Sequence, residues 1–459
     1  MADYDLVVLG SGPGGYVAAI RAGQLGMKTA VVERAELGGV CLNWGCIPSK
    51  SLLRNAEVLG LIKHAEEFGI SFDNLSYDFG VAIDRSRKVV KRLTTGVGSL
   101  LRKNKVDHVQ GVGALKDRST IQVEGGSLLT ADNIIIATGA RERAIPSLPV
   151  DREVVITSRE ALELREVPGR VVIVGGGATG AEFAHIYRTY GAEVTIVELL
   201  PRLVPLEDEE ISRQLERAFT KQGIKAMTGA GVQGIAVNGG VATVTVSSDG
   251  VESVIECDKV LVAVGVQGNV ENIGLEEAGV GTERGFIRID DRMATNVDGI
   301  YAIGDVTGKM LLAHVASAQG VTAVEGIAGR NPSKLDYGLM PRAIYCRPQV
   351  ASFGLTEAQA REQGYEIKIG QFPMAASGKA LALGETDGTV KLVVDAEVGE
   401  VLGAHMIGAE VTELLGELAM TRLLEGTTAE LGWAVHPHPT ISEVVKEAAL
   451  AAEGEAIHI

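Results

Sequence analysis

One arrangement occurs twice in this chain and constrains its fold more than any other feature: an apolar strand, a glycine-rich turn, a helix, and a second strand that ends in an acidic residue. The first turn occupies residues 10–15 with the acid at Glu33, and the second occupies residues 175–180 with the acid at Glu198. Such a turn presents a helix N-terminus to a pyrophosphate, and an acid about 20 residues further on binds a ribose 2′-hydroxyl. The sequence therefore predicts an α/β fold with two Rossmann-like dinucleotide-binding units.

The glycines of each turn have separate roles. Gly10 permits the tight turn, Gly12 allows the backbone to approach the pyrophosphate, and Gly15 allows helix and strand to pack closely. A carboxylate at Glu198 repels a 2′-phosphate, so the second site is expected to prefer NAD to NADP. The candidate dinucleotide-binding residues are Gly10, Gly12, Gly14, Gly15 and Glu33 in the first unit and Gly175, Gly177, Thr179, Gly180 and Glu198 in the second.

Three further apolar stretches end in small residues and glycine: residues 134–139, 260–265 and 299–305. Each is typical of a parallel strand whose C-terminal end approaches a nucleotide. For the first two, a buried strand end without a ligand explains the pattern equally well. Asp305 is more specific, because a carboxylate at a strand end is well placed for a ribityl hydroxyl.

Cys41 and Cys46 are separated by four residues, and a helix is expected to begin beside them, with Pro48 in its first turn. Backbone N–H groups at that helix start favour a thiolate over a thiol, and a thiolate near a second sulfur permits thiol–disulfide exchange. Two buried structural cysteines are an equally good interpretation of the pair by itself. A zinc site is less favoured, because Cys257 and Cys346 are single, and no metal is expected.

The last part of the chain, from about residue 341, has a different pattern. Its segments indicate antiparallel strands, and two helices are expected over residues 412–424 and 441–452. Between them two histidines alternate with prolines, and His438 precedes Glu443, which is expected one turn inside the second helix. A carboxylate that orients an imidazole makes a competent general base, whereas an isolated His-Pro-His more often has a structural capping role.

Length and charge restrict the remaining possibilities. A chain of 459 residues is expected to form several domains. Its net charge of −16 argues against non-specific nucleic-acid binding. The N-terminus runs straight into a strand, which is not a signal-peptide pattern, and no uncharged apolar run has the length of a membrane span. Four cysteines in so long a chain indicate a reducing compartment, and a cytoplasmic location is expected.

The two glycine turns with their acids, the segment 38–50 around the cysteines, residues 295–305 and residues 436–443 occur in the order typical of one family. The sequence resembles the class I pyridine nucleotide-disulfide oxidoreductases over essentially its whole length. The resemblance implies an FAD-binding domain (1–148), an NAD-binding domain (149–271), a central domain (272–340) and a C-terminal α+β interface domain (341–459). It also implies a homodimer in which the C-terminal histidine serves the partner subunit's cysteines.

The resemblance further implies the role of individual residues. Cys41 would be the thiol that meets the substrate sulfur, and Cys46 the thiol against the flavin. Lys50 and Glu182 would form an ion pair near the reactive part of the flavin, and His438, oriented by Glu443, would take the substrate's proton. Further residues expected to line FAD are Gly113, Thr138, Gly139, Asp305, Leu311, Ala313 and His314, and Gly265 is expected on the NAD side.

Within this family, the sequence favours oxidation of protein-bound dihydrolipoamide with reduction of NAD+ to NADH. Such a subunit would serve 2-oxoacid dehydrogenase or glycine cleavage complexes, and its partners would be lipoyl domains and the subunit-binding domain of an acyltransferase. Glutathione-type reductases usually carry basic residues where this chain has Glu198 and its neighbours. Mercuric reductases need a further cysteine pair near the C-terminus, and residues 453–459 contain no cysteine. A soluble transhydrogenase would lack the pair formed here by Cys41 and Cys46. A purely structural flavoprotein would have no need of the cysteines together with His438 and Glu443.

Overall fold

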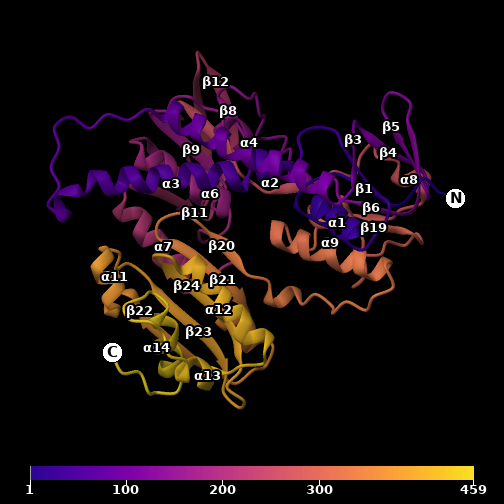
Figure 1. Cartoon of the computed structure of the whole chain (residues 1–459). Helices are drawn as coiled ribbons and strands as arrows, with labels where there is room; N and C mark the ends of the chain where they lie inside the picture. The colour runs from indigo at the N-terminus through magenta and orange to yellow at the C-terminus, as the bar shows by residue number, and fades with distance from the viewer. Residues whose placement is uncertain (1) are drawn as a thin grey trace.

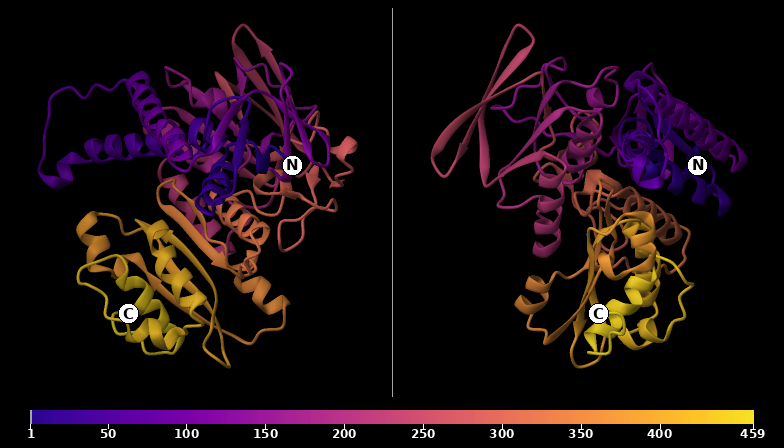
Figure 2. Two further views of the ribbon diagram at one scale, coloured as in Figure 1. Left: turned by 45° about the vertical axis from the view of Figure 1, so that its right-hand side comes forward. Right: turned by 90° about the vertical axis from the view of Figure 1, so that its left-hand side faces the viewer.

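The computed structural model describes residues 2–459 and contains three main sheets with helices packed on them (Figure 1). Two of these sheets are built around the glycine turns, and the third lies in the C-terminal part of the chain. The views in Figure 2 show the C-terminal sheet and its helices set apart from the two nucleotide-type sheets.

The first sheet has the strand order β3–β2–β1–β6–β5–β4, and β19 pairs with β6 as well. Strands β1, β2, β3, β6 and β19 run parallel, as expected for this kind of unit. Helices α1 and α9 pack against each other beside it. The strands are β1 (Tyr4–Leu9), β2 (Thr29–Glu33), β3 (Asp107–Gln110), β4 (Gly113–Asp117), β5 (Thr120–Val123), β6 (Leu128–Ile136) and β19 (Ile300–Ala302), and the helices are α1 (Pro13–Gln24), α4 (Phe79–Lys103) and α9 (Ala313–Ile327).

The second sheet is entirely parallel and has the order β11–β10–β9–β15–β8. A separate antiparallel sheet of β12, β13 and β14 extends from it, and Figure 2 shows this sheet projecting outward. The elements of this part are β8 (Val155–Ile156), α5 (Ser158–Ala161), β9 (Arg170–Val174), α6 (Ala178–Thr189), β10 (Glu193–Glu198), α7 (Glu209–Lys221), β11 (Ile224–Thr228), β12 (Ala230–Asn238), β13 (Val241–Ser248), β14 (Val251–Cys257) and β15 (Lys259–Val262).

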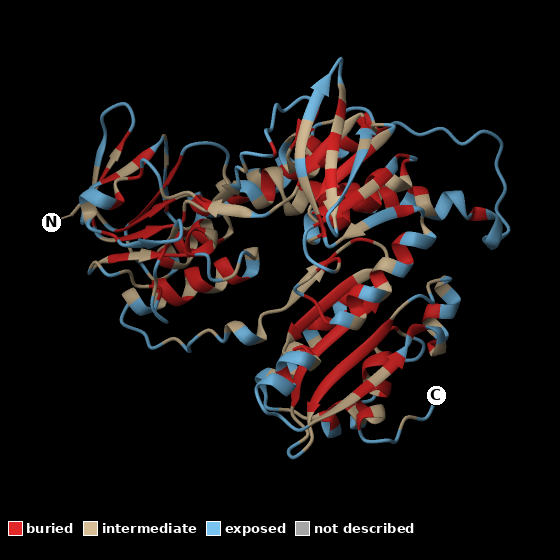
Figure 3. Cartoon of the chain, turned by 180° about the vertical axis from the view of Figure 1, so that it is seen from behind, coloured by how far each residue is buried: buried red, intermediate tan, exposed pale blue. Residues whose placement is uncertain are grey.

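The third sheet is antiparallel, as the sequence predicts, and has the order β20–β21–β24–β23–β22. Strand β24 is buried along its whole length and β23 at all but its last residue, and Figure 3 shows the buried strands of this sheet in red. Its elements are β20 (Arg342–Ile344), β21 (Gln349–Gly354), α10 (Glu357–Glu362), β22 (Ile367–Pro373), α11 (Gly378–Leu383), β23 (Thr389–Asp395), β24 (Val401–Gly408), α12 (Val411–Leu423), α13 (Thr428–Trp433) and α14 (Glu443–Ala452).

Short elements connect these sheets. Strands β7 and β16 pair with each other, and so do β17 and β18. The remaining elements are α2 (Gly39–Trp44), α3 (Cys46–Lys63), β7 (Ala140–Glu142), β16 (Val266–Gly268), α8 (Leu275–Ala278), β17 (Thr282–Glu283), β18 (Phe286–Ile287) and the 3₁₀ turns Ala65–Phe68, Gly304–Thr307, Tyr337–Leu339 and Met374–Ala376.

Two details differ from the sequence-based expectation. Cys41 lies inside a helix of its own, α2, which begins after Gly38 in the left-handed conformation. Such a short helix carries too few residues for its periodicity to be recognised. Glu443 is the first residue of α14 rather than a residue one turn inside it, because residues 439–442 turn before the helix begins.

One buried apolar cluster joins parts of the chain that are far apart in sequence. Leu52 of α3, Phe79 of α4, Tyr187 of α6 and Ile344 of β20 belong to it. Burial of this surface stabilises the placement of α3 between the nucleotide-type sheets and the C-terminal sheet. Domain boundaries at 148, 271 and 340 stay a prediction. Within residues 2–459, every helix is too short or too polar to cross a bilayer.

Candidate functional site

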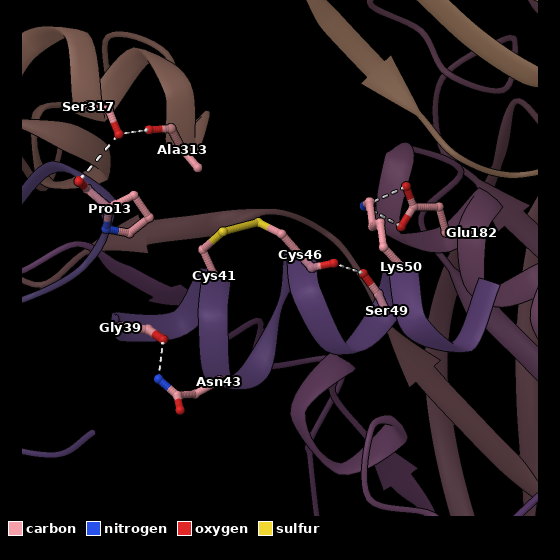
Figure 4. The surroundings of a disulfide bond; sticks show 10 residues. All are labelled: Pro13, Gly39, Cys41, Asn43, Cys46, Ser49, Lys50, Glu182, Ala313 and Ser317. Carbon is pink, nitrogen blue, oxygen red and sulfur yellow. Dashed lines mark hydrogen bonds and ion pairs between the residues drawn. A yellow bond between two sulfur atoms is a disulfide. The ribbon is translucent and has the colours of Figure 1, made fainter. Parts of the chain in front are cut away.

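The two cysteines form a disulfide that joins consecutive helices. Cys41 lies in α2 and Cys46 is the first residue of α3, with their Cα atoms 4.7 Å apart. Gly45 separates the helices in a conformation outside both, and its carbonyl accepts a hydrogen bond from the Ser49 N–H (3.1 Å). Figure 4 shows the bond spanning the gap between the two helices. Because Cys46 begins an 18-residue helix, unpaired N–H groups and the helix dipole favour a negative charge on its sulfur when the bond opens.

One turn further along α3, Lys50 reaches into the second nucleotide unit. Its Nζ donates to both carboxylate oxygens of Glu182 on α6, at 2.8 and 2.9 Å. Glu182 is buried and also accepts a hydrogen bond from the Tyr345 N–H (3.0 Å), while Lys50 Nζ lies 4.7 Å from the centroid of the Tyr345 ring. The expected ion pair is therefore present, and Tyr345, which sequence reasoning missed, joins the C-terminal part of the chain to it. No sequence signal links Tyr345 to a motif more than 160 residues earlier.

The segment between the cysteines is held by a second group of contacts that the sequence did not indicate. Buried Asn43 donates from Nδ2 to the carbonyls of Leu37 (3.0 Å) and Gly39 (2.9 Å). Its own carbonyl accepts a hydrogen bond from Arg87 on α4 (2.8 Å). The guanidinium carbons of Arg87 and Arg159 lie 4.9 and 4.4 Å from the centroid of the Trp44 ring.

The two glycine turns have the same local structure. Gly10 and Gly175 have φ of 106° and 109°, and a Cβ at either position would lie 2.3 Å from a carbonyl oxygen of a neighbouring strand end. A Cβ at Gly15 or Gly180 would lie 2.0 or 1.9 Å from the carbonyl oxygen of the glycine that opens the same turn. These four positions therefore require glycine on steric grounds.

The middle glycine of each turn differs from the others. A Cβ at Gly12 or Gly177 would meet nothing within 4 Å, and each residue caps the N-terminus of a 12-residue helix, α1 or α6. Open space in front of backbone N–H groups at a helix start is what a pyrophosphate requires. The residues present therefore fit a dinucleotide at both turns.

The acidic residues that end β2 and β10 stand beside these turns. Glu33 accepts hydrogen bonds from Ser11 N–H (2.8 Å), Ser11 Oγ (2.7 Å) and Ala35 N–H (2.9 Å). Glu198 accepts from the N–H groups of Gly176 (2.6 Å) and Leu200 (2.8 Å). Both side chains are largely buried, so neighbouring N–H groups fix a negative charge at the edge of each turn.

Asp305 follows β19 at the end of the first sheet. Burial raises the pKa of this carboxyl from 3.8 to about 6. A group in this environment gains from a hydroxyl donor, which fits the expected contact with a flavin ribityl chain. Its backbone neighbour Gly304 donates an N–H to the buried Gln319 side chain on α9 (2.6 Å), which fixes the turn.

Other residues expected near FAD or NAD are placed as follows. Thr138 and Asn269 exchange hydrogen bonds of 2.9 and 2.8 Å between the ends of the two nucleotide units. Gly113 begins β4 and packs against Leu9. His314 bonds the carbonyl of Pro341 (2.9 Å). A Cβ at Gly139 or Gly265 would meet no atom within 4 Å, and the side chains of Thr179 and Leu311 are exposed. Gly14 lies in α1 and Ala313 in α9. Their contacts with a cofactor stay predictions.

His438 and Glu443 form the expected pair in the C-terminal part. His438 Nδ1 lies 2.9 Å from Glu443 Oε1, and Glu443 Oε2 accepts the Thr440 N–H (2.8 Å). Burial opposes ionisation of Glu443, but the Thr440 and His438 hydrogen bonds outweigh it and hold the pKa of its carboxyl below the usual value. The His438 side chain is 79% exposed. Its imidazole is therefore oriented from one side and free on the other.

Within residues 2–459 of a single chain, no hydrogen bond or ion pair connects His438 with the cysteine pair, and Figure 1 shows α2 and α14 in different parts of the molecule. The structure thus brings together Cys41, Cys46, Lys50 and Glu182 but leaves the histidine pair apart. The exposed large apolar side chains of the C-terminal part include Met420 and Leu423 of α12, Leu424 directly after it, and Trp433 and Val435 shortly before His438 in the sequence.

Comparisons with known proteins agree with this geometry. The family model described as pyridine nucleotide-disulphide oxidoreductase matches residues 4–320, and the dimerisation domain of the same family matches residues 340–449. The dihydrolipoyl dehydrogenase of Mycobacterium leprae is 51% identical over 97% of both chains, and that of Zymomonas mobilis is 49% identical over 100% of both.

Solved structures show the same fold. LpdA from Mycobacterium tuberculosis has a TM-score of 0.90 at 27% identity and covers 97% of this chain and 98% of its own. The HOCl-induced flavoprotein disulfide reductase RclA from Escherichia coli, in its Cu(II) complex, has a TM-score of 0.87 at 28% identity over 98% and 99% of the two chains. The expected fold class is confirmed.

Proposed function

The chain belongs to the pyridine nucleotide-disulphide oxidoreductase family, and on that premise we propose that it oxidises protein-bound dihydrolipoamide to lipoamide and reduces NAD+ to NADH, which is dihydrolipoyl dehydrogenase activity. The observation that carries the proposal is the Cys41–Cys46 disulfide, placed at the start of a helix whose Lys50 pairs with Glu182 of the second nucleotide unit. The curated relatives that resemble the whole chain carry the same activity in their names.

FAD fits the first turn and NAD the second. The first is supported by the open backbone at Gly12, the fixed carboxylate of Glu33 and the buried carboxyl of Asp305. The second is supported by the equivalent Gly177 and by Glu198, whose charge disfavours a 2′-phosphate. When bound, flavin and nicotinamide would supply the hydride transfer that thiol–disulfide exchange by itself does not provide.

The chain's own residues perform the sulfur chemistry. One thiol of dihydrolipoamide gives its proton to the free face of His438, and the resulting thiolate attacks the sulfur of Cys41. The Cys41–Cys46 bond breaks, and Cys46 leaves with the electron pair as a thiolate at the start of α3. The second substrate thiol then attacks the substrate sulfur bound to Cys41, so lipoamide leaves as a cyclic disulfide. The sulfur of Cys41 leaves with the electron pair of the broken mixed-disulfide bond and takes up the proton of the attacking thiol.

His438 of one subunit would act on the cysteines of its partner in a homodimer. The match to the family's dimerisation domain supports this arrangement, and so do the exposed apolar side chains of the C-terminal part, because a second subunit could cover them. Lipoyl domains would deliver the substrate, and the subunit-binding domain of a 2-oxoacid dehydrogenase acyltransferase would hold the dimer. The four domains would be residues 1–148, 149–271, 272–340 and 341–459. The free thiols Cys257 and Cys346 suit a reducing compartment such as the cytoplasm.

A steady-state assay of the purified protein tests the proposal. Dihydrolipoamide with NAD should give fast NADH production, and dihydrolipoamide with NADP should react far more slowly. Rapid NADPH oxidation by glutathione disulfide, with an idle lipoamide reaction, would place the chain in the glutathione-reductase branch. If neither pair reacts while yellow flavin stays bound, the proposed substrate is wrong.

A further inference from the structure

Asn43 and Trp44, which lie between the two cysteines, are held by hydrogen bonds and by arginine side chains that do not depend on the disulfide. A disulfide constrains its loop only while it is closed. In each turnover of the proposed function, on which this inference rests, a substrate dithiol supplies two electrons and two protons and leaves as a disulfide, while the Cys41–Cys46 bond opens. Between opening and reclosure, only non-covalent contacts keep the two sulfurs near each other.

We propose that Arg87 and Arg159, through their stacking on Trp44, are positioning residues that hold the Cys41–Cys46 segment in its closed geometry while the disulfide is reduced. Both guanidinium carbons lie within 5 Å of the Trp44 ring centroid, at 4.9 and 4.4 Å. A cation over the face of an indole is attracted by the ring quadrupole, and Trp offers the strongest such interaction.

Trp44 is well placed to transmit this restraint. It lies three residues after Cys41 in the same helix, α2, and two residues before Cys46, so it belongs to the segment that the disulfide closes. Residues three apart on a helix lie on one face, so an anchor on Trp44 also fixes the direction of Cys41.

The two arginines come from different parts of the chain. Arg87 lies on the long helix α4 and also donates to the Asn43 carbonyl (2.8 Å), which fixes the backbone of the segment directly. Its Nε and Nη2 atoms are buried and have no hydrogen-bond partner among residues 2–459, so the segment is the main polar contact of this guanidinium. Arg159 lies on α5, whose start is fixed by a capping box at Thr157. The stack therefore ties the segment to both nucleotide units.

Loss of the contacts between the two arginines and Trp44 should make the disulfide easier to reduce, because these contacts restrain the reduced cysteine pair more than the oxidised pair. The closed disulfide is already constrained, so the contacts restrict the reduced state more than the oxidised state. Loosening them adds conformational freedom to the dithiol and makes the disulfide easier to reduce. Positive charge near a thiolate also affects how easily the disulfide is reduced, so the variants must keep the charges at positions 87 and 159.

The test uses three charge-preserving variants of the full-length flavoprotein: Trp44→Leu, Arg87→Lys and Arg159→Lys. Lysine keeps the charge but lacks the planar group that stacks and donates in a fork. The matched control is Arg92→Lys, on the exposed surface of the same helix α4. Each protein is equilibrated in glutathione buffers near neutral pH, quenched with acid and alkylated. The tryptic peptide 35–50 carries both cysteines and no other, so its mass gives the ratio of dithiol to disulfide.

The expected result is a rise in the dithiol-to-disulfide ratio of about three- to ten-fold for Trp44→Leu, a smaller rise for both lysine variants, and no change for the control. Arg159 is exposed, so Arg159→Lys remains informative if the other two fail to fold. An unchanged ratio in Trp44→Leu or in both lysine variants would overturn the role of the stack. Glutathione replaces the lipoyl substrate here, so a protein inactive with lipoamide would still report on this segment.

Discussion

Lys50 Nζ lies 2.8 and 2.9 Å from the two carboxylate oxygens of Glu182, which follows it by 132 residues. The pair joins the helix of the disulfide to the helix of the second glycine turn, and Tyr345 N–H bonds the same carboxylate. The electrostatics beside the cysteines are therefore set by the packing of three distant segments.

Glu182→Gln removes a buried negative charge and leaves Lys50 without its partner. We expect a loss of about 1–3 kcal/mol in the free energy of unfolding, less than for a fully buried pair because about a third of the Lys50 side chain is exposed. Urea denaturation measures the change. The control is Glu57→Gln, which breaks the exposed Arg54–Glu57 pair on the same helix α3 and should cost under about 0.5 kcal/mol. Equal losses in both variants would mean that the Lys50–Glu182 pair stabilises the fold no more than an exposed ion pair does.

Cys46→Ser should abolish lipoamide turnover, by about a thousand-fold or more, but should leave flavin bound, because a serine hydroxyl cannot form or exchange a disulfide.

Dimers that combine a Cys46→Ser subunit with a His438→Gln subunit test whether the site is shared between subunits. A hybrid contains one site with both the intact cysteines and the intact histidine only if the histidine serves the partner subunit. We expect activity to return in co-expressed hybrids, measured after separation by two affinity tags, and hybrids as inactive as the parents would exclude the shared site.

Two glycine-to-alanine variants in the second turn should differ in what they change: one should lower the stability of the fold, and the other should weaken NAD binding. A Cβ at Gly180 would lie 1.9 Å from the Gly175 oxygen, so Gly180→Ala should destabilise the fold by about 2–4 kcal/mol. A Cβ at Gly177 would meet no atom within 4 Å, so Gly177→Ala should leave the melting temperature nearly unchanged but raise the KM for NAD by about ten-fold. Thermal unfolding together with NAD titration distinguishes them. A Gly177→Ala enzyme with an unaltered KM would mean that the nucleotide binds elsewhere.

Glu198→Gln should reduce the preference for NAD over NADP by about ten- to a hundred-fold, since it removes the charge that repels a 2′-phosphate. The amide keeps an acceptor oxygen for the Gly176 N–H but replaces the oxygen that accepts the Leu200 N–H, so one of the two hydrogen bonds to this side chain remains. The ratio of kcat/KM values for the two nucleotides gives the answer. Glu193→Gln, at the exposed start of the same strand β10, is the control and should leave the ratio as it is. A constant ratio in both variants would disprove the selection by Glu198.

Asp305 should make the protein's stability pH-dependent. Its pKa is about 6 in the fold against 3.8 in the unfolded chain, so the folded state binds the extra proton between these values. Stability therefore falls as pH rises from about 4 to 6, by up to about 3 kcal/mol, and stays lower above that range. In protein stripped of flavin, Asp305→Asn should be more stable than the parent at pH 7 and no more stable below pH 4.

The measurement is urea denaturation at several pH values, with the exposed Asp298→Asn as control. Because flavin would supply a hydroxyl to the carboxylate, the advantage of Asp305→Asn should shrink or reverse in the flavin-loaded protein. An advantage of equal size at pH 4 and pH 7 would show that the carboxyl is not the cause.

Local sequence determined much of this protein. The glycine turns, the acids that follow them and the apolar strands predict both nucleotide units correctly, because a tight turn and a close helix–strand approach exclude any side chain at Gly10, Gly15, Gly175 and Gly180. The strand-like segments from about residue 341 predict the antiparallel sheet, and the helix that begins at Cys46 has Pro48 in its first turn, as expected. These features depend on neighbours within about 30 residues, which a sequence shows directly.

Tertiary structure decided the rest. Tyr345 beside Lys50, and Arg87 and Arg159 over Trp44, are contacts between segments far apart in the chain, and no local pattern marks them. The helix around Cys41 and the exact start of α14 at Glu443 were also set by packing and turn geometry rather than by propensity. The physical reason is that periodicity fixes which face of an element is buried, whereas only the assembled fold fixes which side chains meet there.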